Sequence, residues 1–198
     1  MSTVLISTCT RESIRAETVR WMFAAKRPID IVTSLEPIDW NRNEQVRRFL
    51  STGYTHLFFL DSDSVPMSGT IECLLFHDKP AIIAPNLCFM QREAKVRQMT
   101  FTKPGTVDHF EHEEQTPQII GASGMSGLLV RREVLEKIGD PWFQFHYDND
   151  GKILVGEDID FYRKMAEAGY DLWCDWSLVP SHYKTFDLKQ IWWRGKGQ

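Results

Sequence analysis

The chain has 198 residues, of which 42% are hydrophobic and 25% are charged, and its formal net charge is −4. This balance is typical of a globular α/β domain with a core of good size, and the acidic charge argues against a protein that coats nucleic acid in bulk. The four cysteines include no Cys-x-x-Cys pair, which disfavours zinc ribbons and redox motifs. Without a secretory signal pattern or a membrane-spanning apolar segment, we expect a soluble cytoplasmic protein.

The first half of the sequence alternates between strand and helix patterns. We expect strands at residues 4–7, 29–32, 57–60 and 81–84, and helices at residues 12–25, 41–50 and 66–76. Strand-helix-strand order predicts parallel pairing with right-handed crossovers. The polar loop from Thr8 to Arg11 has no Gly-x-Gly-x-x-Gly, so the fingerprint of a dinucleotide-binding site is absent.

Two aspartates end the apolar run Leu-Phe-Phe-Leu at residues 57–60, because Asp61, Ser62 and Asp63 follow at once. Carboxylates at the carboxyl end of a buried strand are costly unless a cation neutralises them, and open α/β sheets bind ligands at this edge. A divalent cation that carries a phosphorylated ligand would satisfy the pair. Asp, Ser and Pro also form turns, so a plain strand-to-turn exit is the alternative.

The second half opens with a long polar interval, residues 86–118, which indicates strands and loops at one edge of the sheet. His109 and His112 stand there among glutamates, but their spacing matches no standard metal site and favours a solvated loop. In the turn that follows, Gly124 and Gly127 permit either a tight bend or close approach of a ligand. Beyond it we expect a strand at 128–130, helices at 131–138 and 157–168, and a strand at 170–175.

Several polar and aromatic residues stand out in the last third of the chain. Glu157 and Asp158 open a helix, where carboxylates favour the positive end of the helix dipole, so capping alone explains them. His182 follows a short strand, and a lone histidine is more often structural than functional. Trp192 and Trp193 begin an aromatic and basic tail that either packs onto the core or meets an acceptor.

Three segments taken together resemble the nucleotide-sugar glycosyltransferases of the GT-A type, close to family 2. They are Asn41-Arg-Asn with Gly53-Tyr-Thr-His-Leu-Phe-Phe-Leu-Asp-Ser-Asp-Ser-Val-Pro66, then Gly124-Met-Ser-Gly127 through Gly139 with Pro141-Trp-Phe143, then Gly156-Glu-Asp-Ile-Asp-Phe-Tyr with Ser181-His182. Their order and spacing match the family from about residue 4 to residue 184. The resemblance implies an α/β fold with a Rossmann-like, mostly parallel central sheet, flanking helices and a small mixed β region on the acceptor side.

The resemblance also implies a metal site. Asp63 would be the direct ligand of the Asp-x-Asp motif, Asp61 would contact the donor or the metal, and His182 would complete the site. Mixed oxygen and nitrogen ligands suit Mn²⁺ or Mg²⁺ better than Ca²⁺. The metal would neutralise the charge that develops on a nucleoside diphosphate leaving group.

Further roles follow from the same resemblance. Asp158, within the Glu157-Asp158 pair that we predict to be catalytic, matches the base of inverting members. Thr8 and Arg11 would begin the nucleotide pocket, and Ser62 would contact the donor beside the two aspartates. Gly124 and Gly127 would line the donor sugar and the acceptor side.

The implied organisation is a single domain over residues 1–198. About 1–85 would bind the nucleotide, about 86–185 would hold the acceptor and the catalytic residues, and 186–198 would form a tail. The implied activity is metal-dependent transfer of a sugar from a nucleoside-diphosphate sugar to an acceptor hydroxyl. A nucleotidyltransferase and a non-catalytic sugar-nucleotide or glycan-binding module remain alternatives. The donor, the acceptor (a glycan, a small molecule or a hydroxylated nucleic-acid base) and the stereochemical outcome stay open.

Overall fold

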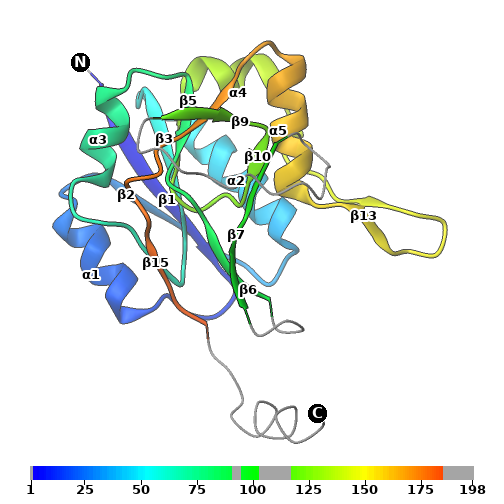
Figure 1. Ribbon diagram of the computed structural model, residues 1–198, viewed down its shortest axis with the longest axis horizontal. Coiled ribbons are helices and arrows are strands. Elements are labelled where there is room, and N and C mark those ends of the chain that lie inside the picture. Colours follow the sequence, from blue (N-terminus) through cyan, green and yellow to red (C-terminus); the bar gives the residue numbers. More distant parts are fainter. Residues whose placement is uncertain (1, 91–94, 103–116, 185–198) are drawn as a thin grey trace, which may run out of the picture.

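A computed structural model describes residues 2–90, 95–102 and 117–184 (Figure 1). Within these residues, a central sheet of seven strands separates two layers of helices. In spatial order the strands are β2 (Ile29–Thr33), β1 (Val4–Thr10), β3 (His56–Asp61), β11 (Leu128–Arg131), β5 (Ala81–Ile83), β14 (Leu172–Cys174) and β9 (Gln118–Ile120). The α/β architecture predicted from the sequence is therefore confirmed.

The sheet is mixed. Strands β2, β1, β3, β5 and β14 run in one direction, while β11 and β9 run in the opposite direction. The prediction of a mostly parallel sheet is therefore correct only in part. The reversal of β11 follows from the glycine-rich turn before it, where Gly127 adopts a left-handed φ of 84° and donates its N–H to the Phe59 carbonyl at 2.8 Å. The turn leads β11 back along β3, so the strand needs no crossover helix.

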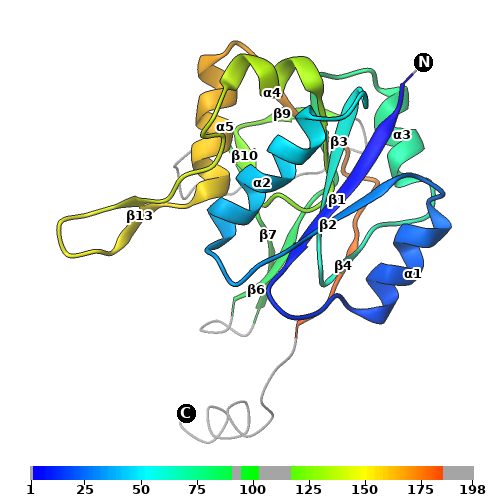
Figure 2. The same cartoon turned by 180° about the vertical axis from the view of Figure 1, so that it is seen from behind.

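Each face of the sheet has its own core. Along β3, Leu57 and Phe59 pack on one side and Phe58 and Leu60 on the other, as the two-residue period of a strand requires. Helices α2 (Ile38–Leu50), α4 (Arg132–Ile138) and α5 (Glu157–Glu167) contribute to the first core, and α1 (Ala16–Ala24) and α3 (Thr70–Phe76) contribute to the second. Figure 2 shows α2, α4 and α5 together, away from α1 and α3.

Strand β1 is longer, and helix α1 shorter, than the sequence predicts. The strand runs to Thr10, so Thr8 lies inside it and the loop begins only at Arg11. The Thr10 hydroxyl then donates to the Ser13 carbonyl at 2.7 Å and accepts the Glu12 N–H at 3.3 Å. This local turn competes with helix formation, which begins at Ala16.

Short strand pairs complete the fold. Antiparallel pairs join β6 (Leu87–Met90) to β7 (Lys95–Gln98), β8 (Thr100–Phe101) to β10 (Ala122–Ser123), β12 (His146–Tyr147) to β13 (Ile153–Val155), and β4 (Ser64–Val65) to β15 (Ser181–His182). The pairing of β4 explains why α3 starts at Thr70 and not at the predicted residue 66. In Figure 1 the β12–β13 hairpin projects from the body of the molecule.

Some sequence predictions concern segments beyond this description. His109, His112 and the tail at 186–198 with Trp192 and Trp193 lie outside the described residues. Among the helices of the described residues, none has both the length and the apolar character that crossing a bilayer requires.

Candidate active site

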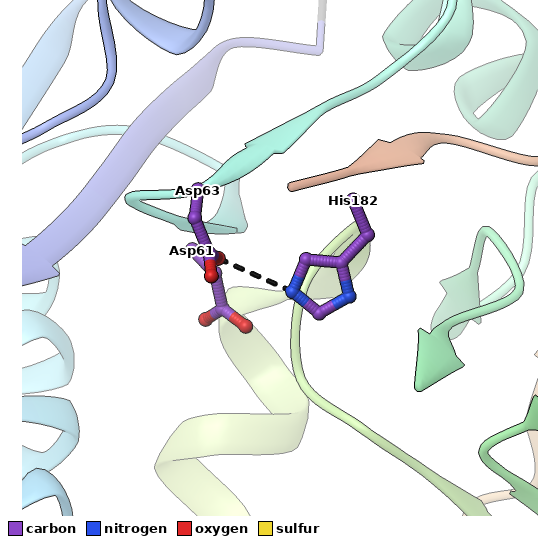
Figure 3. A group of neighbouring side chains, drawn as sticks. All are labelled: Asp61, Asp63 and His182. Atoms are coloured by element: carbon purple, nitrogen blue, oxygen red, sulfur yellow. Dashed lines mark hydrogen bonds and ion pairs between the residues drawn. The ribbon is translucent and has the colours of Figure 1, made fainter. Parts of the chain in front are cut away.

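Asp61, Asp63 and His182 come together at the carboxyl end of β3. Asp61 is the last residue of that strand, Asp63 follows in the turn, and His182 arrives on β15, where it pairs with Ser64 of β4. One ligand atom from each of the three residues lies within 4.8 Å of the other two, the one such group in the described part of the chain (Figure 3). The family resemblance implies that His182 lies beside Asp63, and the structure brings these residues together although they are 119 positions apart in the chain.

The ring of His182 is held in one orientation. Its Nδ1 atom lies 2.6 Å from the Leu87 carbonyl oxygen, and since a carbonyl only accepts, Nδ1 carries a proton. The other nitrogen, Nε2, lies 3.2 Å from Oδ1 of Asp63. This is the arrangement of a metal-binding histidine, in which a second partner fixes the tautomer and aims the free nitrogen at the site.

Asp63 is an ionised carboxylate that contacts both His182 and Lys184. Its Oδ2 atom accepts a hydrogen bond from Nζ of Lys184 at 2.8 Å, while Oδ1 faces His182. Burial alone would raise the pKa of Asp63, but the hydrogen bonds from His182 and Lys184 outweigh it and lower this pKa to about 2. The bond to Asp63 raises the pKa of His182, although burial opposes that change. The site therefore favours a bound positive charge.

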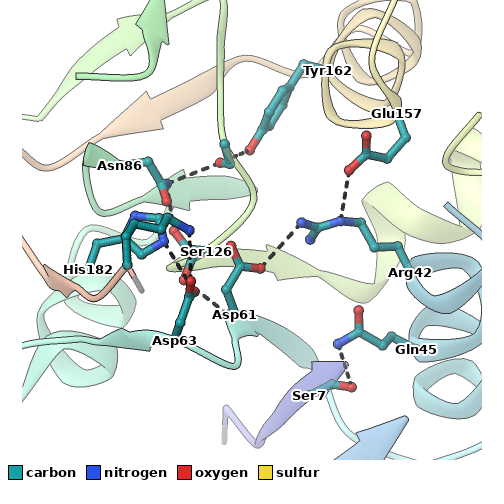
Figure 4. A network of polar contacts seen from close by, with 12 residues as sticks. Ser7, Arg42, Gln45, Asp61, Asp63, Asn86, Ser126, Glu157, Tyr162 and His182 are labelled. Carbon is teal, nitrogen blue, oxygen red and sulfur yellow. Dashed lines mark hydrogen bonds and ion pairs between the residues drawn. The ribbon is translucent and has the colours of Figure 1, made fainter. Parts of the chain in front are cut away.

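Arg42 links the aspartate motif to helix α5, a role that the sequence analysis missed. Its side chain is buried, with Nη2 at 3.4 Å from Asp61 Oδ1 and Nε at 3.3 Å from Glu157 Oε1 (Figure 4). Burial lowers the pKa of Arg42, but Asp61 and Glu157 more than offset this effect and keep the guanidinium charged. The Asn41-Arg42-Asn43 segment is polar throughout, so the sequence gives no sign that these side chains are buried.

Glu157 and Asp158 open α5 as predicted. Burial raises the pKa of both carboxyls, and the charge of Arg42 partly offsets the change. Asp158 Oδ1 accepts the N–H of Ile159 at 2.8 Å. The same oxygen lies close to Gly156, because a Cβ atom at that position would be only 2.9 Å from it. A carboxylate with a raised pKa is a stronger base than one on the surface, so the pair suits proton transfer.

The glycine-rich loop runs beside the aspartates. Asp61 donates its N–H to Oγ of Ser126 at 3.2 Å, and Asn86 donates to the Ser126 carbonyl at 2.7 Å (Figure 4). Gly124 packs against the Asn86 side chain, and a Cβ atom at Gly127 would lie 3.2 Å from that of Ala84. Close packing therefore explains why glycine stands at both positions. The contact of these glycines with a donor stays a prediction.

Three predicted donor-binding residues remain, and they lie in different environments. Thr8 is fully buried in β1, where its Oγ1 has no hydrogen-bond partner among the described residues. This position corrects the expectation that Thr8 belongs to an open loop. Arg11 is exposed just beyond the end of β1. Ser62 forms the turn between the aspartates, and its carbonyl accepts the Arg15 N–H at 2.9 Å.

A fully buried carboxylate, Asp160, was also missed. His146 Nε2 lies 2.7 Å from its Oδ1, and Arg163 Nη2 lies 2.6 Å from the same oxygen. Lys164 Nζ lies 2.7 Å from Oδ2. These contacts tie the base of the β12–β13 hairpin to the first turns of α5, which carries Glu157 and Asp158.

Comparison with known proteins bears on the fold of the chain. No family model matches the sequence, and no curated protein matches it significantly. Among solved structures, A197 from STIV is 18% identical with a TM-score of 0.68, and the match covers 92% of this chain and 86% of that one. GalNAc-T7, solved with UDP, GalNAc and Mn²⁺, is 8% identical with a TM-score of 0.57, and the match covers 93% of this chain. The fold is GT-A-like. The match spans only 44% of the GalNAc-T7 chain.

Proposed function

We propose that this protein is a metal-dependent glycosyltransferase that moves a sugar from a nucleoside-diphosphate sugar to an acceptor hydroxyl. The observation that carries the proposal is the meeting of Asp61, Asp63 and His182 at the carboxyl end of β3 in a GT-A-like fold. Two carboxylates and one imidazole form a ligand set of mixed oxygen and nitrogen atoms. Such sets suit Mn²⁺ or Mg²⁺.

The residues fit a divalent cation for two independent reasons. The Nε2 atom of His182 faces the carboxylates because Nδ1 is engaged by Leu87. Asp63 is ionised over the whole physiological range, so its carboxylate is available as a ligand. Asp63 and His182 would hold the metal, with Asp61 as the third ligand. When bound, the metal would act as a Lewis acid that neutralises the leaving nucleoside diphosphate.

The remaining steps belong to side chains of the chain itself. Asp158 would accept the proton of the acceptor hydroxyl, as its raised pKa permits. Glu157 would act together with Asp61, because the Arg42 guanidinium forms ion pairs with both carboxylates. Arg42 would thus keep the donor end and the acceptor end of the site in one fixed arrangement.

The donor proposal rests on two observations. The absence of a glycine-rich loop after β1 disfavours a nucleotidyltransferase. GalNAc-T7, whose fold this chain shares over 93% of its length, was solved with UDP, GalNAc and Mn²⁺. We therefore place UDP-sugars first among the donors, with Mn²⁺ as the first metal to test.

The direct experiment is turnover of a panel of nucleotide sugars, followed by release of nucleoside diphosphate with Mn²⁺, with Mg²⁺ and with chelator. We expect metal-dependent release from at least one donor, and loss of that release in the Asp63→Asn variant. The Asp150→Asn variant, which removes an exposed carboxylate in the projecting hairpin, is the matched control and should behave as wild type.

Three results would contradict the proposal. Undiminished turnover by the Asp63→Asn variant in chelator would exclude a role for the triad. Release of pyrophosphate from a nucleoside triphosphate and a sugar phosphate would instead identify a nucleotidyltransferase. Tight donor binding without any turnover would point to the binding module.

A further inference from the structure

Lys184 forms an ion pair with Asp63 of the candidate metal site. Its Nζ atom lies 2.8 Å from Oδ2, while Nε2 of His182 lies 3.2 Å from Oδ1. Both oxygens of this carboxylate therefore already face positively charged or hydrogen-bonding groups. A divalent cation that used Asp63 would meet the Lys184 ammonium as a like charge on the same carboxylate.

The backbone contacts of the two residues before Lys184 place it beside Asp63. His182 pairs with Ser64, and Tyr183 donates its N–H to the Asp63 carbonyl at 2.9 Å. The guanidinium of Arg15 lies 4.5 Å from the centre of the Tyr183 ring and holds the segment from the other side. His182 and Lys184 are two residues apart in extended chain, so both side chains reach toward Asp63.

The contact of Lys184 can be broken at little cost. Its side chain is 41% exposed and that of Asp63 is 31% exposed, and ion pairs at such positions contribute little to stability. The long aliphatic stem lets the ammonium group swing to a new partner without a change in the backbone. A nearby phosphate group would offer such a partner.

We infer that Lys184 is a displaceable counter-ion, which competes with a divalent cation for Asp63 and moves to the phosphate oxygens of a diphosphate ligand that arrives with the metal. This inference rests on the metal site in the proposed function. It predicts that metal alone binds weakly and that diphosphate strengthens its binding, since the anion draws Lys184 away from Asp63. Coupling of this kind is reciprocal, so the metal must strengthen diphosphate binding by the same factor.

The test measures Mn²⁺ binding by titration calorimetry, with and without inorganic diphosphate as the probe, corrected for Mn²⁺ bound by free diphosphate. Removal of the competing charge in Lys184→Gln should tighten the binding of Mn²⁺ alone by about threefold to tenfold. It should also weaken the enhancement by diphosphate. Lys184→Arg, which keeps the charge, should restore the behaviour of wild type. Lys152→Gln removes an exposed lysine from the projecting hairpin and should change neither value.

The inference is overturned if the Lys184→Gln variant binds Mn²⁺ no more tightly than wild type, or if diphosphate enhances Mn²⁺ binding equally in both. Thermal melting of each variant separates these results from a loss of fold. A comparison with Asp63→Asn keeps the two proposals apart. If Asp63→Asn abolishes Mn²⁺ binding while Lys184→Gln leaves it unchanged, only the role of Lys184 fails. If Asp63→Asn also leaves it unchanged, the metal site itself fails.

Discussion

Arg42 on α2, which is buried, forms an ion pair with the partly exposed Asp61 at the end of β3, with 3.4 Å between Nη2 and Oδ1. The same guanidinium contacts Glu157 on α5, so one cation joins three elements that meet at the candidate site. The charge of Arg42 also affects the pKa values of the nearby carboxyl groups. Burial raises the pKa of Glu157 and of Asp158, and the charge of Arg42 partly offsets both changes.

Removal of this cation should destabilise the fold. In Arg42→Met the carboxylates of Asp61 and Glu157 lose their buried partner, which costs about 3–5 kcal/mol. Urea denaturation measures the change. Arg47→Met, which breaks an exposed ion pair with Asp140, is the control and should cost about 1 kcal/mol at most.

A double variant makes the same prediction sharper. Adding Glu157→Gln to Arg42→Met removes one of the two orphaned charges, so part of the lost stability should return. If Arg42→Met stays within about 1 kcal/mol of wild type, the carboxylates are solvated and the buried network is not as described.

Loss of His182 should weaken metal binding. We expect His182→Ala to lower Mn²⁺ affinity by at least about tenfold, because an imidazole ligand and its fixed orientation are lost. The chain offers a close control in His77, whose Nε2 lies 2.8 Å from Asp175 without belonging to a metal-binding group in the described residues. His77→Ala should bind Mn²⁺ as wild type does. Equal affinity of both variants would remove His182 from the site.

Asp158→Asn tests the proposed base. If Asp158 accepts the acceptor proton, kcat should fall by about 10²–10⁴ while KM for the donor changes little. Steady-state kinetics with the best donor gives both values. The exposed residue Asp171 provides a control, since Asp171→Asn should leave kcat unchanged. A product with retained anomeric configuration by NMR would assign Asp158 a role other than base.

Asp160 should make stability depend on pH. Burial alone would raise the pKa of Asp160, but Lys164 and His146 outweigh it and hold this pKa below its ordinary value. A lowered carboxyl pKa adds stability that is complete above the unfolded value of about 3.9 and disappears as the pH falls through the folded value. Wild type should thus exceed Asp160→Asn by about 2 kcal/mol at pH 6.

That difference should shrink steadily below about pH 4, as protonation removes the charge that the variant lacks at every pH. Unfolding free energies of both proteins between pH 6 and pH 3 provide the comparison. A gap that is constant over this range would mean that Asp160 acts through packing and not through its charge.

The sequence predicts the parts of the site that depend on local pattern. An apolar run before Asp61 and Asp63 identifies a buried strand end, and Gly156 with Glu157 identifies the start of a helix. Both features lie where they were expected. The position of His182 beside the aspartates is implied by the family resemblance alone, and β15 achieves it by pairing with β4.

Such local patterns do not predict ion pairs between residues that are far apart in the chain. Arg42 stands in a helix rich in charged residues, where an arginine normally faces water, and only the packing of α2 against the site turns it inward. Asp160 looks like one more acidic residue in a first turn until His146 of the hairpin is placed beside it. The reversal of β11 likewise depends on the turn at Gly127, because strand propensity carries no direction.

The most direct measurement for the central claim is anomalous diffraction at the manganese edge from crystals grown with Mn²⁺ and UDP. We predict one strong peak at bonding distance, about 2.0–2.3 Å, from a carboxylate oxygen of Asp63 and from Nε2 of His182, with the diphosphate on its open side. A peak elsewhere, or none at this strand end while UDP is bound, would contradict the claim that these residues form the metal site of a glycosyltransferase.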